Sequence, residues 1–524
     1  MDYGSFSLSY SYTYTSEGLK KSLTYPDGTT VGYSYDNSDR LTGVDIPGQG
    51  RISIGKFTWN SPAKTTYPGG SEKQINYDPL MRTSDITALD PGDNAVLDRD
   101  YEYSPVGNLL SKETEQGDIS YTYDKLSRLT NSSSERYTYD SVGNRLSSAD
   151  TSEPWSYNRN NELLDNGKSS FEYDDSGRLI KRDTPRGVLH YSYNAQGRLS
   201  KIEDGSGNVI AEYYYDPFGR RLWKEVDGER TYFLYSQEGL IGEYKESGQA
   251  VRNYGYRPDT TWGNNPLFLK KDSAYYWYLN DRQGTPKKLI SNNGKVVWSA
   301  QYDSFGKAHV STELVENNLR LAGQYYDIET GLHYNLNRYY DPSLGRYLTP
   351  DPLREGLNPY LYAQNNPLRY MDPLGLCVVN NVNWGAVRKG AIETFIGVAA
   401  VYGGAMVSAS AIGATAGVPA ILAGSASIGW GVSQITAGFM GNEIPFMGTK
   451  EAIIKNTTKS EKLEDKLLGT NELVNMLSTR GTSPSKIGKI SDALQSGQSI
   501  YESGSTIIEE MNNDKDVNNG KGDQ

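Results

Sequence analysis

A short unit recurs through the first 376 residues of the chain, and it constrains the fold more than any other feature. The unit reads Tyr-Asp (Tyr-Asn in one copy), two or three residues, Gly or Ser/Asp, Arg or Asn, and then Leu. The clearest copies are YDNSDRLT (35–42), YTYDKLSRLT (121–130), YTYDSVGNRL (137–146), FEYDDSGRLI (171–180), YSYNAQGRLS (191–200) and YYYDPFGRRL (213–222). Self-similarity at short, regular spacing is typical of repeat architectures.

Each unit has the chemistry of a β-hairpin. The Tyr-x-Tyr alternation places two aromatic rings on one face of a strand. Asp and Gly favour the turn that follows, and Arg-Leu opens the return strand. One hairpin is only marginally stable in water, so the units must stack into a long sheet. The 42 Tyr and 55 Gly residues agree with this, and we predict a mainly β fold of antiparallel hairpins.

The composition limits how the fold can be stabilised, which partners the chain can bind and how it can be secreted. It has one cysteine, so no internal disulfide framework can support the fold. The net charge of −11 argues against nucleic acid as a partner. The first residues, MDYGSFSLSYSYTYTSEG, show neither the basic nor the apolar region of a signal peptide. We therefore expect secretion without a signal peptide, through a specialised secretion system.

Three later segments carry the most specific signature. They are YYWYLNDRQGTPKKLISNNGKVVWSAQYDSFGK (275–307), LRLAGQYYDIETGLHYNLNRYYDPSLGRYLTPDPL (319–353) and LNPYLYAQNNPLRYMDPLGL (357–376). With the repeats, they resemble the Rhs family of YD-repeat proteins, which includes the C subunits of insecticidal Tc toxins and teneurins. The resemblance covers roughly residues 20–376. Family shells are commonly longer than the repeat region of this chain.

The resemblance implies a spiralling sheet that encloses the C-terminal segment of the chain. It divides the sequence into a YD-repeat β-shell over 1–274, a core-associated module over 275–376, and a C-terminal effector over 377–524. We expect the effector to be small and mainly α-helical. A repetitive surface or structural protein without cargo is the alternative that the repeats alone leave open.

The resemblance also implies self-cleavage. Asp351 and Asp372, each followed by Pro, would be the two acids of an aspartyl-protease-like centre, and Arg338 the supporting cation. The bond cut would be Leu376–Cys377. Two close carboxylates share a proton, so one can activate water while the other polarises the carbonyl. The alternative is that both Asp-Pro pairs are ordinary strand-ending turns.

One position departs from the family pattern of this centre. The first Asp-Pro is usually followed, two residues on, by Gly, but this chain has Arg354 there. The departure concerns how the loop 352–358 folds, and it leaves the second motif, DPLGL, unaffected.

The composition changes abruptly after Leu376. Residues 394–442 contain no charged side chain, and Pro419 divides the run into two halves, each long enough to cross a bilayer. Small residues recur four apart and would form one helical stripe: Ala405, Ala409, Gly413 and Gly417. We expect 394–441 to be a membrane-inserting helical hairpin, with passive translocation or a soluble core as alternatives.

The rest of the effector limits its chemistry. Residues 444–513 have the apolar spacing of short amphipathic helices, and a polar tail follows. The last histidine is His333 and the one cysteine is Cys377, so histidine-metal nucleases, zinc deaminases and Cys-His or Ser-His hydrolases lack required residues. The carboxylates of the segment match no site template. We expect no metal and no cofactor.

These observations predict a toxin whose shell cuts its own chain once, as an aspartyl self-protease, and so releases a membrane-inserting effector that forms pores or depolarises its target. The expected partners are a target-cell membrane, a cognate immunity protein and a secretion-system spike or adaptor, such as those of type VI secretion in competition between bacteria. An enzymatic toxin carried by the same shell is the alternative activity.

Overall fold

The computed structural model describes residues 1–376 except 60, 149–150, 152–153, 259 and 355. The chain divides into two units, Met1–Val379 and Asn380–Gln524, and all the described residues belong to the first. The predicted effector, with its expected helices, therefore lies outside the described residues.

The first sheet contains thirteen strands, and a separate pair follows it. Their bounds are β1 Ser11–Tyr14, β2 Lys20–Thr24, β3 Thr30–Tyr35, β4 Leu41–Ile46, β5 Gly50–Thr58, β6 Ser61–Thr66, β7 Glu72–Tyr77, β8 Thr83–Leu89, β9 Ala95–Tyr103, β10 Leu109–Thr114, β11 Ile119–Tyr123, β12 Leu129–Ser132, β13 Glu135–Arg136, then β14 Thr138–Tyr139 and β15 Arg145–Ser147.

The next sheet has sixteen strands and the last has four. Their bounds are β16 Ser156–Tyr157, β17 Leu163–Asp165, β18 Ser170–Tyr173, β19 Leu179–Thr184, β20 Gly187–Tyr193, β21 Leu199–Asp204, β22 Val209–Tyr215, β23 Arg221–Val226, β24 Glu229–Tyr235, β25 Leu240–Tyr244, β26 Ala250–Tyr256, β27 Pro266–Lys271, β28 Ala274–Asn280, β29 Pro286–Ile290, β30 Val296–Tyr302, β31 Ala308–Glu313, then β32 Tyr325–Asp327, β33 Leu332–Asn335, β34 Arg338–Asp341 and β35 Arg346–Tyr347. A 3-10 turn, η1, spans Ala363–Asn365.

In every sheet each strand pairs with its neighbours in sequence, and the pairs are antiparallel. The prediction of a mainly β shell of antiparallel hairpins is confirmed. The sixteen-stranded sheet runs without a break through the predicted boundary at 274/275, which falls at the first residue of β28. Within the described residues, no helix is long and apolar enough to cross a membrane.

The repeated unit folds through one carboxylate. Asp124 accepts the backbone amides of Leu126 and Arg128 through Oδ1, at 2.9 Å each. Its Oδ2 accepts Arg128 Nε at 2.6 Å. Between them, Ser127 has φ 61°, in the left-handed region where most repeats have Gly. One Asp therefore holds both sides of its turn together.

The same Asp–Arg contact recurs along the wall, with N–O distances of 2.6 to 2.7 Å. The pairs are Asp36–Arg40, Asp78–Arg82, Asp124–Arg128, Asp174–Arg178 and Asp216–Arg220.

A tyrosine directly before the turn joins one hairpin to the preceding one. The Tyr139 hydroxyl donates to the carbonyl of Leu129 at 2.7 Å, and the Arg128 guanidinium lies 5.0 Å from the centre of the Tyr139 ring. The same backward bond, at 2.6 to 2.8 Å, joins Tyr35 to Lys20, Tyr77 to Pro62, Tyr103 to Thr83, Tyr123 to Leu109, Tyr157 to Arg145, Tyr193 to Leu179 and Tyr215 to Leu199. These bonds explain why the repeat uses Tyr, which has a hydroxyl to donate, where Phe would only fill space.

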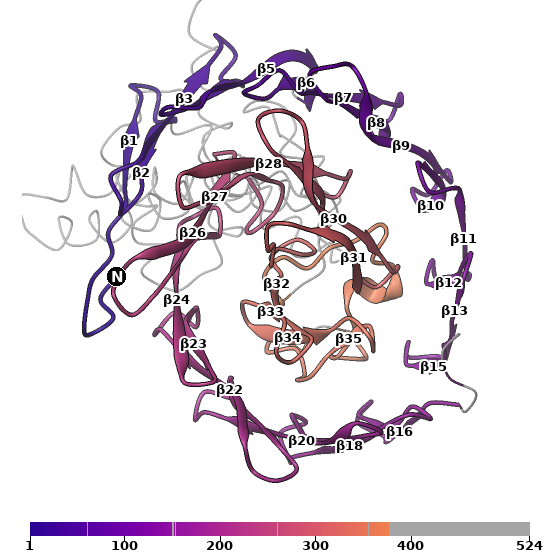
Figure 1. Cartoon of the computed structure of the whole chain (residues 1–524). Coiled ribbons are helices and arrows are strands. Elements are labelled where there is room, and N and C mark those ends of the chain that lie inside the picture. The colour runs from indigo at the N-terminus through magenta and orange to yellow at the C-terminus, as the bar shows by residue number, and fades with distance from the viewer. Residues whose placement is uncertain (60, 149–150, 152–153, 259, 355, 377–524) are drawn as a thin grey trace, which may run out of the picture. The chain divides into compact units, whose positions relative to one another are not determined.

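Within this unit the strands follow a curve, so that later strands lie inside earlier ones (Figure 1). Strands β26–β28 pass inside β1–β5, and the small sheet β32–β35 lies at the centre (Figure 1). The Tyr25 hydroxyl donates to the carbonyl of Tyr254, and that of Tyr67 to the carbonyl of Tyr278. The predicted spiral is therefore packed turn against turn, and its interior holds the segment that carries the predicted cleavage centre.

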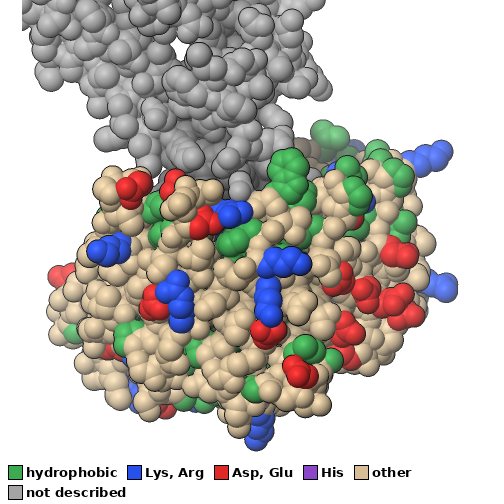
Figure 2. All heavy atoms as spheres, turned by 90° about the horizontal axis from the view of Figure 1, so that it is seen from above, with side chains coloured by type: hydrophobic (Ala, Val, Ile, Leu, Met, Phe, Trp, Pro, Cys, Tyr) green, Lys and Arg blue, Asp and Glu red, His purple; other side chains and the backbone are tan. Residues whose placement is uncertain are grey.

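The face drawn in Figure 2 carries many charged side chains and some apolar ones. Figure 2 shows Lys, Arg, Asp and Glu side chains interspersed over the face drawn, with Asp and Glu gathered toward its right side. On the neighbouring strands β8 and β9, Asp85 lies opposite Asp100. Burial, with Asp98 and Asp85 beside it, raises the pKa of Asp100. This sign of charge repels a phosphate backbone, in keeping with the expectation that nucleic acid is not a partner, which stays a prediction.

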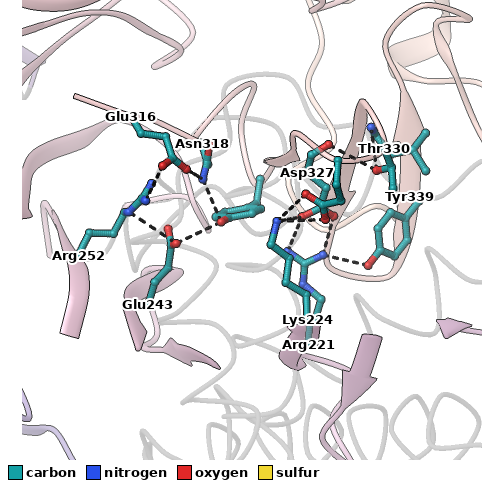
Figure 3. A network of polar contacts seen from close by, with 12 residues as sticks. Arg221, Lys224, Glu243, Arg252, Glu316, Asn318, Asp327, Thr330 and Tyr339 are labelled. Atoms are coloured by element: carbon teal, nitrogen blue, oxygen red, sulfur yellow. Dashed lines mark hydrogen bonds and ion pairs between the residues drawn. The ribbon is translucent and has the colours of Figure 1, made fainter. Parts of the chain in front are cut away.

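A buried ionic network ties the central sheet to the wall (Figure 3). Arg221 on β23 makes a two-pronged contact with Asp327 at the end of β32, with N–O distances of 2.6 and 3.0 Å. Both side chains are fully buried. Lys224 lies 3.2 Å from Asp327 and 2.9 Å from Glu329. Charges buried this completely are stable only while each keeps its partner.

We predict that Asp327→Asn lowers the free energy of unfolding by about 3 kcal/mol or more, because it leaves the Arg221 guanidinium buried without a carboxylate. The matched control is Asp45→Asn on β4. Its partner Arg51 lies 2.9 Å away, but the two side chains are 51% and 40% exposed, so the loss should stay below about 1 kcal/mol. Urea unfolding, followed by tryptophan fluorescence, measures the free energy of unfolding of both variants. Equal losses of stability in the two variants would contradict the role given to burial.

Candidate self-cleavage site

The structure brings together the three residues predicted to form the cleavage centre. Arg338 begins β34, Asp351 follows β35, and Asp372 lies in the last described turn. Arg338 Nη2 is 2.9 Å from Asp372 Oδ2 and 3.2 Å from Asp351 Oδ2. One guanidinium nitrogen therefore contacts both carboxylates and holds them side by side.

The centre is almost fully shielded from solvent. The side chains of Arg338, Asp351 and Asp372 are 2%, 8% and 1% exposed. Burial raises the pKa of Asp372, and the nearby Asp351 carboxylate adds to the rise. Arg338, the Tyr347 hydroxyl and the Leu376 amide oppose it without cancelling it. A carboxyl with a raised pKa is suited to donating a proton.

Arg338 is fixed on every side. Its Nε donates to the carbonyl of Gly375 at 2.7 Å, and its Nη1 donates to the carbonyl of Pro359 at 3.0 Å. Its guanidinium carbon lies 3.6 Å from the centre of the Tyr347 ring. The cation thus binds the two acids and also the backbone one residue before Leu376, the expected end of the shell.

The DPLGL segment forms a turn like those of the repeats. The Leu376 amide donates to Asp372 Oδ1 at 3.0 Å, as the Arg128 amide does to Asp124 Oδ1 in a wall hairpin. In the wall the fourth residue after Asp is usually Arg, which occupies the second carboxylate oxygen. Here that residue is Leu376, so Asp372 Oδ2 is left for Arg338 and Tyr347. The candidate site is therefore a repeat turn whose own arginine has been replaced.

Gly375 is required at its place in this turn. Its φ of 62° is left-handed, which favours glycine. A Cβ built on it would lie 2.4 Å from the Asn335 carbonyl oxygen, so a side chain at 375 would collide with backbone. The turn packs Leu374–Leu376 against the loop between β33 and β34.

Two residues of the site were missed by sequence reasoning. The Tyr347 hydroxyl donates to Asp372 Oδ2 at 2.8 Å. The Asn335 side-chain amide donates to the Tyr347 hydroxyl and to the Asp372 carbonyl, each at 2.8 Å. Both fix the orientation of Asp372. The sequence indicated only that both residues belong to the segment 319–353. Nothing in the residues around either one marks it as a neighbour of Asp372.

A pocket of about 400 Å³ reaches the two acids. Its lining includes Arg338, Asp351 and Asp372, and also Val142 and Gly143 from the turn between β14 and β15. Water can therefore approach carboxylates that are otherwise buried, which is what hydrolysis at this centre requires. In the described part of the chain, no three His, Cys, Asp or Glu side chains gather in a way that could hold a metal ion.

The remaining predicted site residues cannot be placed. Cys377, on the far side of the expected cut, lies outside the described residues. So do the members of the predicted membrane stripe, Ala405, Ala409, Gly413 and Gly417, and the predicted hairpin turn at Pro419.

Arg354 occupies the position where the family pattern has Gly, and its backbone conformation shows the effect of that difference. Its φ is 51°, in the left-handed region, and its amide donates to the Asp351 carbonyl at 2.9 Å. The loop therefore keeps a conformation that suits glycine, although an arginine occupies the position. A non-glycine residue in this region costs about 1 to 2 kcal/mol.

We predict that Arg354→Gly leaves the protein as stable as before or raises its free energy of unfolding by up to about 1 kcal/mol. The relieved backbone strain is partly offset by the greater freedom of glycine in the unfolded chain. Arg354→Val should lower stability by about 1 kcal/mol or more, because a β-branched residue resists positive φ. Thermal unfolding of the two variants makes the comparison, and a Val variant as stable as the Gly variant would rule out the left-handed loop.

The chain is similar in sequence to known YD-repeat proteins. The Teneurin YD-shell family model matches residues 108–368. Double-stranded DNA deaminase toxin A of Burkholderia cenocepacia (strain H111) is 30% identical over 357 residues, covering 59% of this chain and 25% of its own length. The probable deoxyribonuclease RhsA of Dickeya dadantii (strain 3937) is 26% identical over 385 residues, covering 68% of this chain and 26% of its own. This chain thus spans about a quarter of the length of these relatives.

Among solved structures, the crystal structure of TcdB2-TccC3-Cdc42 matches with a TM-score of 0.58 and 20% sequence identity, covering 70% of this chain and 22% of the other. At that identity the match shows the fold alone. Taken with the family model and the relatives, it agrees with the repeat turns and the wound sheet described above. The chain therefore belongs to the Rhs/YD-shell family.

Proposed function

We propose that residues 1–376 form a container that cuts its own chain between Leu376 and Cys377 and so frees residues 377–524. One observation carries the proposal: two buried carboxylates meet at Arg338, in a pocket open to water, and one of them binds the Leu376 amide. Because the bond to be cut belongs to the same chain, the effective concentration of substrate is high and one turnover is enough.

The geometry suggests how the two acids divide the work. Asp351 lines the pocket and would take a proton from the attacking water, whose oxygen bonds to the carbonyl carbon of Leu376. Asp372, whose pKa is raised by burial, would give its proton to the departing nitrogen of Cys377 as the carbon–nitrogen bond breaks. Arg338 would offset the negative charge that develops on the centre.

We predict that Asp372→Asn abolishes cleavage without disturbing the turn. Asparagine can hold such a turn, because Asn194 Oδ1 accepts the amides of Gln196 and Arg198 at 3.0 Å each. The substitution therefore removes the proton donor and keeps the fold. Intact mass spectrometry should show one unbroken chain of 58.1 kDa, where the parent chain gives two fragments.

The matched control is Asp124→Asn, which makes the same change in a wall turn and should leave cleavage complete. Partial sequencing of the smaller fragment should place Cys377 at its N-terminus. If the same fragment forms in Asp372→Asn, the assignment of the centre is wrong.

For the freed segment, we favour membrane insertion through the uncharged run at 394–441, with depolarisation or pore formation as the toxic event. A single hairpin encloses no channel, so several copies would have to assemble. The chain would be exported without a signal peptide by a specialised secretion system, and a cognate immunity protein would protect the producing cell.

An enzymatic effector is the second candidate, and the relatives favour it. Their names describe a double-stranded DNA deaminase toxin and a probable deoxyribonuclease. Against it stands the absence of any histidine after His333, which removes the usual ligands and bases of such enzymes.

We predict that expressing the full chain in bacteria collapses the membrane potential, and that Ala409→Leu prevents the collapse because it breaks the small-residue stripe. Ala411→Leu makes the same change off the stripe and should leave the collapse intact. A potential-sensitive dye measures the membrane potential, and gel analysis of cellular DNA and tRNA from the same cultures measures nucleic-acid degradation. Degraded nucleic acid with an intact potential would favour the enzymatic effector, and unimpaired growth would favour a non-toxic surface protein.

A further inference from the structure

A second cavity, of about 50 Å³, lies between the wall and the inner strands. It shares no lining residue with the pocket at the cleavage centre. The wall contributes Tyr101 from β9, Lys112 from β10 and Tyr121 from β11. The inner strands contribute Arg282, from the turn between β28 and β29, together with Lys287 on β29 and Tyr302 at the end of β30.

The cations of this cavity are poorly matched by carboxylates. Among the described residues, no hydrogen bond or ion pair joins Lys112 to another side chain. Arg282 donates to a backbone carbonyl, that of Leu368, and lies over the ring of Tyr101. Burial, with Lys287 and Arg99 nearby, lowers the pKa of Lys112 to about 7. The positive charge here is therefore costly as the cavity stands.

The carboxylates at hand are already engaged. Asp281 binds Lys287 at 3.1 Å and also accepts the amides of Gln283 and Thr285. Asp303, which also lines the cavity, binds His309 at 2.7 Å. Neither is directed to Lys112, so the unmet charge has no counterpart in the described part of the chain.

Two buried hydroxyls at the cavity also have hydrogen-bonding capacity to spare. The Tyr101 side chain is 7% exposed, and no described group accepts from or donates to its hydroxyl oxygen. The same holds for the hydroxyl of Tyr302. Near Tyr101 and Lys112, the Nε of Arg99 also has no hydrogen-bond partner, although its Nη2 pairs with Glu115; the Arg99 side chain is 7% exposed. Buried donors of this kind commonly bind an ordered water or an ion.

We propose that this cavity is a binding site for a small tetrahedral oxyanion such as phosphate or sulfate. Lys112 and Arg282 would supply the charge, and the hydroxyls of Tyr101 and Tyr302 would donate to the remaining oxygens. A cavity of about 50 Å³ has room for several water-sized groups, which suits an ion with four oxygens. Because Lys112 belongs to the wall and Arg282 to the inner strands, the anion would clamp the two layers of the container together.

The test is thermal unfolding of the full chain in sodium phosphate and in sodium chloride at equal ionic strength, with phosphate binding followed by titration calorimetry. Phosphate should raise the Tm by several degrees. In Lys112→Met the phosphate shift should vanish, with affinity at least about tenfold weaker, while the Tm in chloride should equal or exceed that of the parent because a partly buried cation without a carboxylate partner has gone. These opposite effects separate a lost ligand from a damaged fold.

Lys181→Met is the matched control, since Lys181 lies on the outer wall and pairs with the exposed Glu172. It should keep the full phosphate shift. Tyr302→Phe removes one donor hydroxyl without changing charge and should weaken binding about fivefold. The proposal is overturned if phosphate stabilises Lys112→Met as much as the parent chain, or if it stabilises neither.

Discussion

The carboxylate of the repeat aspartate is the interaction on which the rest of this structure depends. In five wall turns it accepts two backbone amides through one oxygen and binds an arginine through the other. In three of these turns the arginine lies against the tyrosine of the next hairpin, and this tyrosine donates back to the preceding one. Single hairpins are only marginally stable, and they form a continuous wall because ion pairs, cation–π contacts and tyrosine hydrogen bonds join neighbouring turns.

The candidate cleavage centre follows from the same turn with one change. At DPLGL the fourth residue after the aspartate is leucine, so the oxygen that a repeat arginine would occupy faces the interior. Arg338, brought from β34, takes that place and draws Asp351 to it. The turn that has a structural role in the wall therefore contributes, at the centre of the spiral, one acid of a buried pair close to Leu376. Burial supplies the electrostatic shift that a solvent-exposed repeat turn lacks.

The spiral also explains why so much charge lies inside. Successive windings pack through tyrosine hydroxyls and long cationic side chains as well as through apolar groups, as the Arg221–Asp327 contact shows. Such an interior is specific because each polar group needs its own partner. The cavity around Lys112 is one place in the described part of the chain where cations and hydroxyls meet without enough acceptors.

Local chemistry is what the sequence determined by itself. Tyr-x-Tyr-Asp followed by Gly and Arg-Leu specifies a hairpin, because turn conformation and strand alternation depend on neighbouring residues. The family resemblance added Asp351, Asp372 and Arg338 as one group. Tyr347 and Asn335 at that group, and Lys112 beside Arg282, were decided by the tertiary structure. These residues come together because strand twist accumulates over many hairpins and determines which strands of the wall face the inner strands. No short stretch of sequence encodes that accumulated twist.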